Sequence, residues 1–307
     1  MGMGCWAIGG TLSRDGKPDG WSGADDAQSI LAIHRAIDLG INFFDTADMY
    51  GGGHSERLLA QALSGGKRDK IVLATKFGLT FDEQKREAYA SDASPDYIRR
   101  ACDASLRRLN TDRIDLYQFH VNQYDPALAP QVIGVLEELV SAGKIRWYGW
   151  STDNPLAARV FAEQGAHCTA IQQHLNIFAG NAEVLAICEQ HNLASINRGP
   201  LGMGLLTGKF SADSQIPADD IRSRWNLHEG DMAKRLEKLA ALRDVLTSDG
   251  RSLAQGALGY LWALSKNTIP IPGFKNTTQV EENVGALKFG PLSPQQMATV
   301  RAVVTSL

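Results

Sequence analysis

Three apolar runs each end on a charged or titratable side chain: Ile41-Asn42-Phe43-Phe44-Asp45, Ile71-Val72-Leu73-Ala74-Thr75-Lys76 and Ile114-Asp115-Leu116-Tyr117-Gln118-Phe119-His120. Runs this apolar are typical of buried parallel strands that have helices on their outer face. In barrel enzymes, the functional side chains collect at the carboxyl ends of such strands. We therefore expect Asp45, Lys76 and His120 to meet at one rim. Tyr50, which follows the first run, would join them in a proton-donating site.

The same alternation of strand-like and helix-like segments continues through the sequence. It predicts eight strands, over residues 4–8, 41–45, 71–76, 114–120, 145–150, 168–172, 193–197 and 268–271. Helices are expected between and after them, over 26–39, 54–64, 95–109, 129–141, 155–163, 181–190, 232–247, 252–265, 276–284 and 293–305. We expect loops over the Gly-, Asp- and Pro-rich stretch before Gly23, after Lys76, and over 199–231.

An eight-strand count favours a closed (β/α)8 TIM barrel over an open, doubly wound sheet. No G-x-G-x-x-G motif follows the first strand, as an open dinucleotide-binding sheet would require. Neither a composition break nor a flexible linker divides the chain. We therefore expect residues 1–307 to form a single barrel domain of the α/β class.

Composition excludes several classes of function. The net charge is −3 and charged residues make up 21% of the chain, so a nucleic-acid or anionic-membrane partner is not expected. The four cysteines, Cys5, Cys102, Cys168 and Cys188, form no C-x-x-C pair, which argues against a disulfide framework or a metal site. The sequence shows no targeting signal and no run of membrane length, so a cytoplasmic location is expected. Nothing in it points to a particular oligomeric state.

Residues 45–56 read D-T-A-D-M-Y-G-G-G-H-S-E. Together with Ala74-Thr75-Lys76, residues 116–120 and Gly149-Trp150-Ser151, this stretch resembles the aldo-keto reductase superfamily. The similar segments follow the family order from Gly4 to about Leu292. The resemblance implies a (β/α)8 barrel that binds NADPH, or less often NADH, without a Rossmann domain. It also implies the reduction of aldehydes and ketones to alcohols.

Carbonyl reduction explains the four polar residues. The carbonyl oxygen gains negative charge and must be protonated as the charge forms. Tyr50 would be the acid, although an isolated tyrosine phenol has a pKa of about 10. A neighbouring Lys76 would stabilise the phenolate and make the proton easier to donate. Asp45 would keep Lys76 charged, and His120 would orient the carbonyl; the resemblance implies the same roles. Each residue also has a structural alternative: a helix cap for Asp45, an aromatic anchor for Tyr50, a rim charge for Lys76 and a core position for His120.

The resemblance also implies the cofactor contacts. Ser151, Thr152, Gln172 and Asn176 match the positions that hold the nicotinamide carboxamide, although Thr152 replaces the usual Asn. Arg198 stands where many members carry an aromatic residue that stacks on the nicotinamide, and a guanidinium can also stack on a ring. The following loop resembles the pyrophosphate-covering segment, because its glycines let backbone N–H groups approach phosphate. Its candidate residues are Gly199, Pro200, Leu201, Gly202, Gly204, Leu205, Thr207, Gly208 and Lys209.

A second segment, residues 271–283, resembles the family's site for the adenosine 2′-phosphate. Lys275, Thr277 and a helix start beside them suit a phosphate, which favours NADPH over NADH. Gln279 stands where many members place an arginine. The resemblance adds Gly273, Phe274, Glu282 and Asn283 as further contacts, the last two at the adenine. Turn capping, loop mobility and surface solvation are the alternative interpretations of these cofactor segments.

The residues at the rim of the predicted barrel indicate the kind of substrate. Five aromatic residues could wall a pocket: Trp6, Trp21, Phe77, Trp150 and Trp225. The chain begins at the first barrel strand, without the β-hairpin that usually precedes it, and ends without the long tail of many members. We therefore expect an open pocket for small aldehydes, ketones or sugars.

Three other functions compete with carbonyl reduction. The first is a sugar or alcohol dehydrogenase that works oxidatively with NAD(P)+. The second is a cofactor-sensing regulatory subunit, like the potassium-channel β subunits that share this fold. The third is an aldolase with Lys76 as the Schiff-base nucleophile, which needs a neutral amine. Asp45 would keep that amine charged, so the third is disfavoured.

Overall fold

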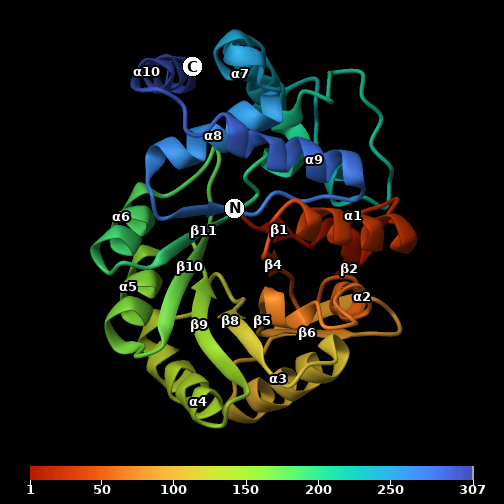
Figure 1. The fold of residues 1–307 in the computed structure, drawn as a ribbon, viewed down its shortest axis with the longest axis vertical. Helices are drawn as coiled ribbons and strands as arrows, with labels where there is room; N and C mark the ends of the chain where they lie inside the picture. Colours follow the sequence, from red (N-terminus) through yellow and green to blue (C-terminus); the bar gives the residue numbers. More distant parts are fainter. Residues whose placement is uncertain (306–307) are drawn as a thin grey trace.

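Eight parallel strands surround the centre of the computed structural model, which describes residues 1–305 (Figure 1). In sheet order these strands are β1 (Met3–Gly4), β4 (Phe43–Asp45), β5 (Val72–Phe77), β8 (Ile114–Phe119), β9 (Ile145–Ser151), β10 (Cys168–His174), β11 (Ala194–Arg198) and β12 (Thr268–Pro270). The first and last strands approach each other, because the amides of Gly2 and Gly4 donate to the carbonyls of Pro270 and Pro272 at 3.0 Å. The predicted (β/α)8 barrel is confirmed.

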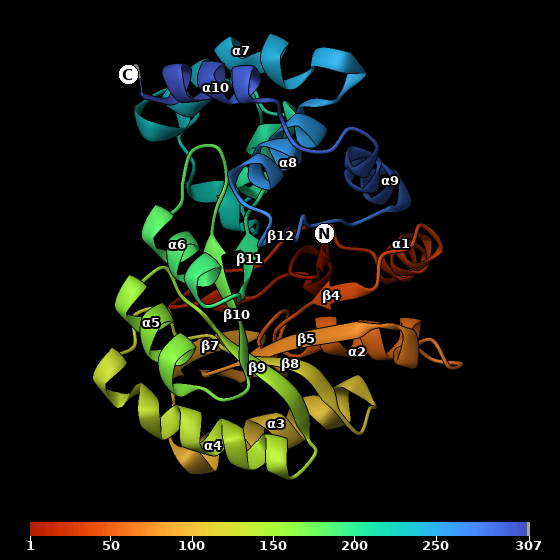
Figure 2. The same cartoon turned by 60° about the vertical axis from the view of Figure 1, so that its left-hand side comes forward.

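Ten helices lie among the described residues, mostly on the outside of the barrel. They are α1 (Asp26–Asp38), α2 (His54–Ala62), α3 (Pro95–Leu109), α4 (Ala129–Ser141), α5 (Pro155–Gln164), α6 (Ala182–Gln190), α7 (Gly230–Leu246), α8 (Leu253–Leu264), α9 (Thr277–Gly285) and α10 (Pro294–Thr305). Helices α1 and α9 lie side by side, and α7 and α10 form an outer layer beyond α8 (Figure 2). Within residues 1–305, no helix has the length and apolar character that crossing a membrane requires.

The alternation of side chains along the strands separates two of the apolar clusters of the core. A large apolar cluster fills the space between strands and helices, with Leu73, Tyr117 and Ile171 among its strand members. A smaller cluster faces the barrel axis and consists of Ala74, Leu116, Ala170, Ile196 and Ile271. Successive strand residues point to opposite faces, so the residues two positions further along the strands also face the axis. A polar layer therefore lies directly above the apolar floor; it includes Lys76, Gln118 and Gln172.

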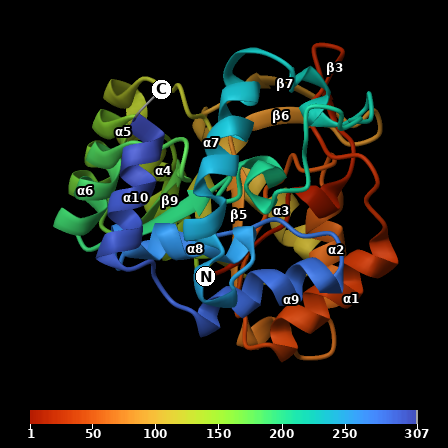
Figure 3. The ribbon, with the colours of Figure 1, turned by 90° about the horizontal axis from the view of Figure 1, so that it is seen from above.

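Three sequence expectations about local structure are wrong. The expected strand over 4–8 ends at Gly4, and Ala7–Gly9 form a 3-10 helix, because an apolar run indicates burial rather than a hydrogen-bonding pattern. The expected loop after Lys76 contains the hairpin β6 (Leu79–Asp82) and β7 (Glu87–Ser91). The expected loop before Gly23 contains β2 (Ser13–Arg14), which pairs with β7. Strand β3 (Lys17–Pro18) completes this small sheet. Figure 3 shows the sheet near the segment that leads into α7.

We predict that Gly4→Ala destabilises the fold, because a Cβ atom there would lie 2.6 Å from the carbonyl oxygen of Ile271, at the closing seam. Overpacking of this kind costs about 1–3 kcal/mol. Gly134→Ala, in the middle of α4, is the matched control, since among the described residues no atom beyond its chain neighbours and the nearby backbone of α4 lies within 4 Å of its Cβ position. It should be neutral or stabilising by roughly 0.5–1 kcal/mol. Thermal unfolding followed by circular dichroism measures both; equal melting temperatures would contradict the prediction.

Candidate active site

The polar layer is built around one buried ion pair. Lys76 Nζ, at the end of β5, donates to Asp45 Oδ1 at 2.5 Å and to the carbonyl of Thr46 at 2.7 Å. The same ammonium lies 3.3 Å from the Tyr50 hydroxyl. The Lys76 side chain is fully buried and that of Asp45 is 2% exposed, whereas Tyr50 is only partly buried. The phenol is therefore the member of this group that can meet a ligand.

The second oxygen of Asp45 is held by two amides. Gln118 Nε2 of β8 and Gln172 Nε2 of β10 each donate to Asp45 Oδ2 at 2.8 Å, and Gln172 also donates to Gln118 Oε1 at 3.0 Å. Gln172 was predicted as a carboxamide contact, and in the structure its amide nitrogen meets Asp45. Sequence reasoning missed Gln118. Its signal was strand alternation, because Gln118 lies midway between the inward-facing Leu116 and His120.

These contacts fix the charges. Burial lowers the pKa of Lys76, but attraction to Asp45 and contact with Tyr50 outweigh it, so the pKa lies above the ordinary lysine value. Burial raises the pKa of Tyr50, and the charge of Lys76 opposes that shift only in part. At neutral pH, Lys76 is therefore an ammonium and Tyr50 a neutral phenol, which can donate a proton.

His120 stands next to the phenol. Its ring meets the Tyr50 ring edge-on, with centroids 6.0 Å apart. Its Nδ1 atom is buried and has no hydrogen-bond partner among residues 1–305. Burial, and then the positive charges of Lys76 and Arg198, hold the pKa of His120 well below its ordinary value. The imidazole is therefore neutral at neutral pH and can contact a ligand through a hydrogen bond but not through a charge.

Two of the five candidate pocket aromatics lie beside Tyr50. Trp6 stacks on the Tyr50 ring at a centroid distance of 5.8 Å, and Trp21 meets Trp6 edge-on at 5.5 Å. Phe77 and Trp150 are fully buried in the core, and Trp225 packs against Phe210 instead. The wall next to the phenol is thus formed by the two tryptophans.

The residues expected at the nicotinamide end gather around the ends of β9, β10 and β11. Ser151 is buried, and the Thr152 hydroxyl donates to the carbonyl of Asn122 at 3.2 Å. The Arg198 guanidinium forms an ion pair with Asp153. Asn176 Nδ2 donates at 2.9 Å to the carbonyl of Gly199, which begins the glycine-rich loop. These contacts connect the strand ends directly to that loop.

The glycine-rich loop uses conformations that favour glycine. Gly199, Gly202, Gly204 and Gly208 have φ values of 61°, 55°, 92° and 75°, and Met203 shares this left-handed region at 55°. The Thr207 hydroxyl donates to the carbonyl of Gly204 at 2.8 Å. Pro200, Leu201 and Leu205 are buried, so they anchor the loop to the core.

A cluster of cations flanks this loop. The Arg222 guanidinium lies 4.5 Å from the centre of the Trp21 ring, and Lys275 Nζ lies 5.8 Å from it. Lys209 Nζ and the Arg222 guanidinium lie 5.1 Å and 5.3 Å from the Phe210 ring. Burial, and then the charge of Arg222, lowers the pKa of both lysines. Sequence reasoning found the two lysines but missed Arg222.

One carboxylate balances the cluster. Asp220 is fully buried and accepts from Arg222 Nε at 2.7 Å and from Arg222 Nη2 at 2.8 Å. Despite its burial, these hydrogen bonds lower the pKa of Asp220 to about 2. Asp220 is thus an anion already engaged by Arg222, and Asp219 also attracts Lys275. The three cations therefore still exceed the two carboxylates beside the glycine-rich loop.

The last predicted segment lies at the start of α9. Lys275 Nζ donates to the carbonyl of Ser22, and its backbone amide donates to Gln279 Oε1 at 2.8 Å. Thr277 is the first residue of α9, with Glu282 in its second turn. Asn283 Nδ2 donates to the carbonyl of Gly273 at 3.3 Å. The Phe274 side chain is 1% exposed and belongs to the core, so this residue can contact a ligand only through its backbone.

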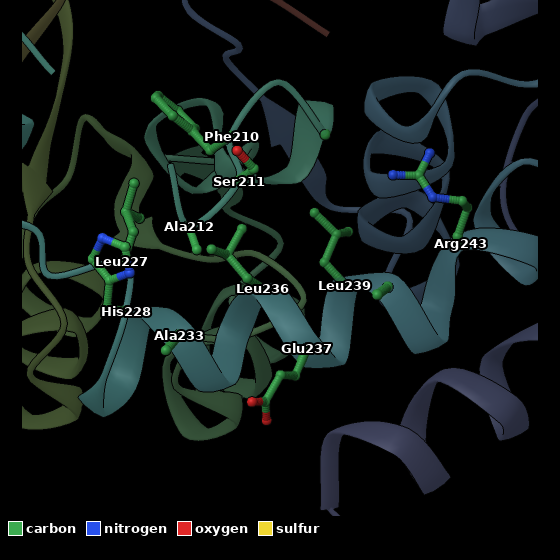
Figure 4. Close-up of a pocket in the computed structure, with 12 residues that line it drawn as sticks. Phe210, Ser211, Ala212, Leu227, His228, Ala233, Leu236, Glu237, Leu239 and Arg243 are labelled. Atoms are coloured by element: carbon green, nitrogen blue, oxygen red, sulfur yellow. The ribbon is translucent and has the colours of Figure 1, made fainter. Parts of the chain in front are cut away.

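A cavity of about 330 Å³ lies behind the glycine-rich loop rather than at the phenol. Leu236 and Leu239 of α7 point toward the segment that carries Phe210 and Ser211, and Glu237 points away (Figure 4). Among the described residues, its lining contains neither Tyr50 nor any of its polar neighbours. It is therefore separate from the phenol and the ion pair, although its lining includes Gly208 of the glycine-rich loop.

Comparison with known proteins gives a consistent result. The model of the "Aldo/keto reductase family" matches residues 1–305. The chain is 33% identical to aldo-keto reductase yakc of Schizosaccharomyces pombe, which is named with NADP(+), over 86% of this chain and 79% of that protein. Among solved structures, it is similar to the glycerol dehydrogenase of Gluconobacter oxydans, with 32% identity and a TM-score of 0.82, covering 99% and 90% of the two chains. A Klebsiella pneumoniae aldo-keto reductase in complex with NADPH is 26% identical, with a TM-score of 0.72 and the same coverage.

We predict that the neutral, buried imidazole of His120 makes stability depend on pH. The folded state holds the His120 pKa below the unfolded value of about 6.5, so acid favours the unfolded state. This contribution is fully present above the unfolded pKa and is lost as the pH falls below it. Between about pH 7.5 and about pH 5.5, the melting temperature should fall less in His120→Asn than in the wild type. His228→Asn, at an exposed position, is the control, and it should behave like the wild type. An equal fall in His120→Asn and the wild type would contradict the prediction.

Proposed function

Since the chain belongs to the aldo/keto reductase family, we propose that it reduces small aldehydes and ketones with NADPH and that Tyr50 delivers the proton. The observation that carries this proposal is the contact of a part-exposed phenol with a fully buried, charged lysine. Such an arrangement supplies a proton and stabilises the group that loses it. Small sugars belong to the same substrate class, because they present an aldehyde or ketone in their open form.

The site residues divide the chemistry among them. A nicotinamide cofactor, when bound, would supply the hydride for the carbonyl carbon. As the carbonyl oxygen becomes negative, Tyr50 donates its proton to that oxygen. Lys76 stabilises the phenolate, and Asp45 keeps Lys76 charged and in place. The neutral His120 imidazole donates a hydrogen bond that orients the carbonyl oxygen. Because Asp45 holds Lys76 as an ammonium, a Schiff-base reaction is disfavoured.

The loop and the cation cluster fit the phosphates of NADPH. The left-handed glycines of residues 199–208 can turn backbone N–H groups toward a pyrophosphate. Lys209, Arg222 and Lys275 supply more positive charge than Asp220 balances. A third phosphate, as NADPH carries on its ribose, suits this excess better than the free hydroxyl of NADH. In the Klebsiella pneumoniae relative, NADPH is the molecule in the complex.

A second candidate is the oxidation of small polyols with NADP+. The similarity to a glycerol dehydrogenase, at 32% identity over nearly the whole chain, favours it. The same residues would serve, with Tyr50 as the base rather than the acid. Assays in both directions, with NADPH and an aldehyde panel and with NADP+ and a polyol panel, compare the two candidates. A cofactor sensor would bind NADPH and turn over neither panel.

We predict that Tyr50→Phe lowers kcat for 4-nitrobenzaldehyde by about 10²- to 10⁴-fold, because the proton donor is lost. The Kd for NADPH, measured by fluorescence titration, should stay near that of the wild type. Tyr89→Phe is the control, since Tyr89 is 42% exposed and its hydroxyl contacts Glu87. A Tyr50→Phe enzyme as active as Tyr89→Phe would refute the role of Tyr50. Wild-type binding without turnover would favour the sensor.

We predict that Lys275→Gln weakens NADPH binding roughly tenfold, because one charged contact to the 2′-phosphate is lost. The affinity for NADH, which lacks that phosphate, should change little. Lys288→Gln, at an exposed site in the 3-10 helix after α9, controls for the loss of one positive charge. Fluorescence titrations with both nucleotides measure the ratio of affinities, and an equal loss for NADPH and NADH would rule out a 2′-phosphate contact.

A further inference from the structure

The motif over residues 45–56 ends in Ser55-Glu56, and the chemistry proposed above leaves this pair unused. Both residues lie in the first turn of α2, where side chains are usually solvated, yet both are fully buried. Both point toward the barrel strands and contact the neighbours of the central ion pair. Their burial therefore calls for a specific reason.

Ser55 connects α2 to the residue after Asp45. Its hydroxyl accepts from the Thr46 hydroxyl at 2.8 Å and donates to the carbonyl of Cys5 at 2.8 Å. The Thr46 backbone carbonyl, in turn, accepts from Lys76 Nζ at 2.7 Å. Thr46 thus accepts a hydrogen bond from the Lys76 ammonium through its carbonyl, and its hydroxyl is bound to Ser55 of α2. Movement of this turn would shift an acceptor of Lys76.

Glu56 connects the same turn to the residue before Lys76. Its Oε1 atom accepts from the Thr75 hydroxyl at 2.6 Å. Because side chains alternate along a strand, Thr75 faces the helices while Lys76 faces the barrel axis. The hydrogen bond on the outer face therefore fixes the strand backbone that aims the Lys76 side chain on the inner face.

A buried carboxylate needs a cation, and Arg108 of α3 supplies it. Arg108 Nε donates to Glu56 Oε2 at 2.6 Å, and its Nη1 donates to Glu83 Oε1 at 2.9 Å. The Arg108 side chain is 9% exposed and passes over Gly53, where a Cβ atom would lie 2.7 Å from Arg108 Cδ. Gly53 also has a φ of 84°, so both its conformation and its close contact require glycine.

A second buried carboxyl, Asp48, does not compete for this cation. Burial, and then repulsion from Glu56, raises the pKa of Asp48 well above its ordinary value despite the nearby Arg108. Its Oδ1 atom has no hydrogen-bond partner among the described residues. Burial therefore favours the neutral form of Asp48, and Arg108 forms its ion pair with Glu56.

We propose that Ser55, Glu56 and Arg108 are positioning residues that hold Thr46 and Thr75, and thereby set the distance from the Lys76 ammonium to the Tyr50 hydroxyl. This inference rests on the proposed function, in which that distance controls proton delivery. It assigns a role to the end of the 45–56 motif: two side chains outside the barrel act on the ion pair inside it.

Thr75→Val tests this inference, because it removes only the hydroxyl that reaches Glu56 and preserves the branched shape. We expect the single-turnover rate of NADPH oxidation with 4-nitrobenzaldehyde to fall roughly tenfold, since small displacements of reacting groups are costly. The Kd for NADPH and the KM for the aldehyde should change by less than about twofold. Thr75→Ser retains the hydroxyl and should restore the rate.

Thr268→Val is the matched control. Thr268 is also a buried strand threonine whose hydroxyl donates to backbone carbonyls, of Leu261 and Ser265, but it begins β12 at the opposite end of the barrel. Both valine variants should lose similar thermal stability, and only Thr75→Val should lose rate. If Thr75→Val keeps the wild-type rate, or if Thr268→Val slows equally, the positioning role is wrong and the contact is only structural.

A second measurement needs no turnover. Reductive methylation followed by mass spectrometry reports the accessibility of Lys76, which is fully buried in the wild type. We expect faster labelling of Lys76 in Thr75→Val than in the wild type or Thr268→Val. If the wild type turned over no substrate but Lys76 were still labelled faster in Thr75→Val, the proposed function would be refuted and the positioning role would stand. Unchanged labelling in Thr75→Val would overturn the positioning role itself.

Discussion

The buried ion pair between Lys76 and Asp45 is the constraint on which the rest of the site depends. Two charges inside a barrel lose their hydration, and their attraction offsets that loss only when further hydrogen bonds complete both groups. Here the Thr46 carbonyl completes the ammonium, and the amides of Gln118 and Gln172 complete the carboxylate. Four strands, β4, β5, β8 and β10, must therefore close to their observed register before the pair is stable. The barrel and its polar layer are thus a single structural requirement.

The second concentration of charge lies at the rim, and there charges of the same sign lie close together. Lys209, Arg222 and Lys275 are held close together by aromatic faces and by one carboxylate, so they repel one another. The lowered pKa values of the two lysines reflect first their burial and then that repulsion. An anion placed among them would relieve it. The interior pair is complete in itself, whereas the rim cluster would be stabilised by a bound anion. In the proposed function, the first holds the proton donor and the second favours a charged cofactor.

The sequence predicted the barrel and the meeting of Asp45, Tyr50 and Lys76, because both follow from strand ends, which apolar runs mark well. It did not predict the partners that come from elsewhere. Gln118 looked like one polar residue within an apolar run, and Arg222 lies in a segment without periodicity. The hairpin of β6 and β7 was missed because short rim strands carry little apolar signal. Loop contacts such as Lys275 with Ser22 depend on tertiary approach, which local pattern does not encode.

The protonation of Tyr50 bears on the direction of the reaction. A reductase needs the phenol to carry its proton when hydride arrives, whereas a dehydrogenase working in the oxidative direction needs the phenolate as a base. Burial raises the pKa of Tyr50, and the ammonium of Lys76 corrects that only in part, so the phenol keeps its proton at neutral pH. In the proposed reaction, the resting site is thus prepared for reduction, and oxidation would gain as the pH rises. The lysine would not remove the proton in advance; it would lower the cost of losing it at the moment when the substrate oxygen becomes a base.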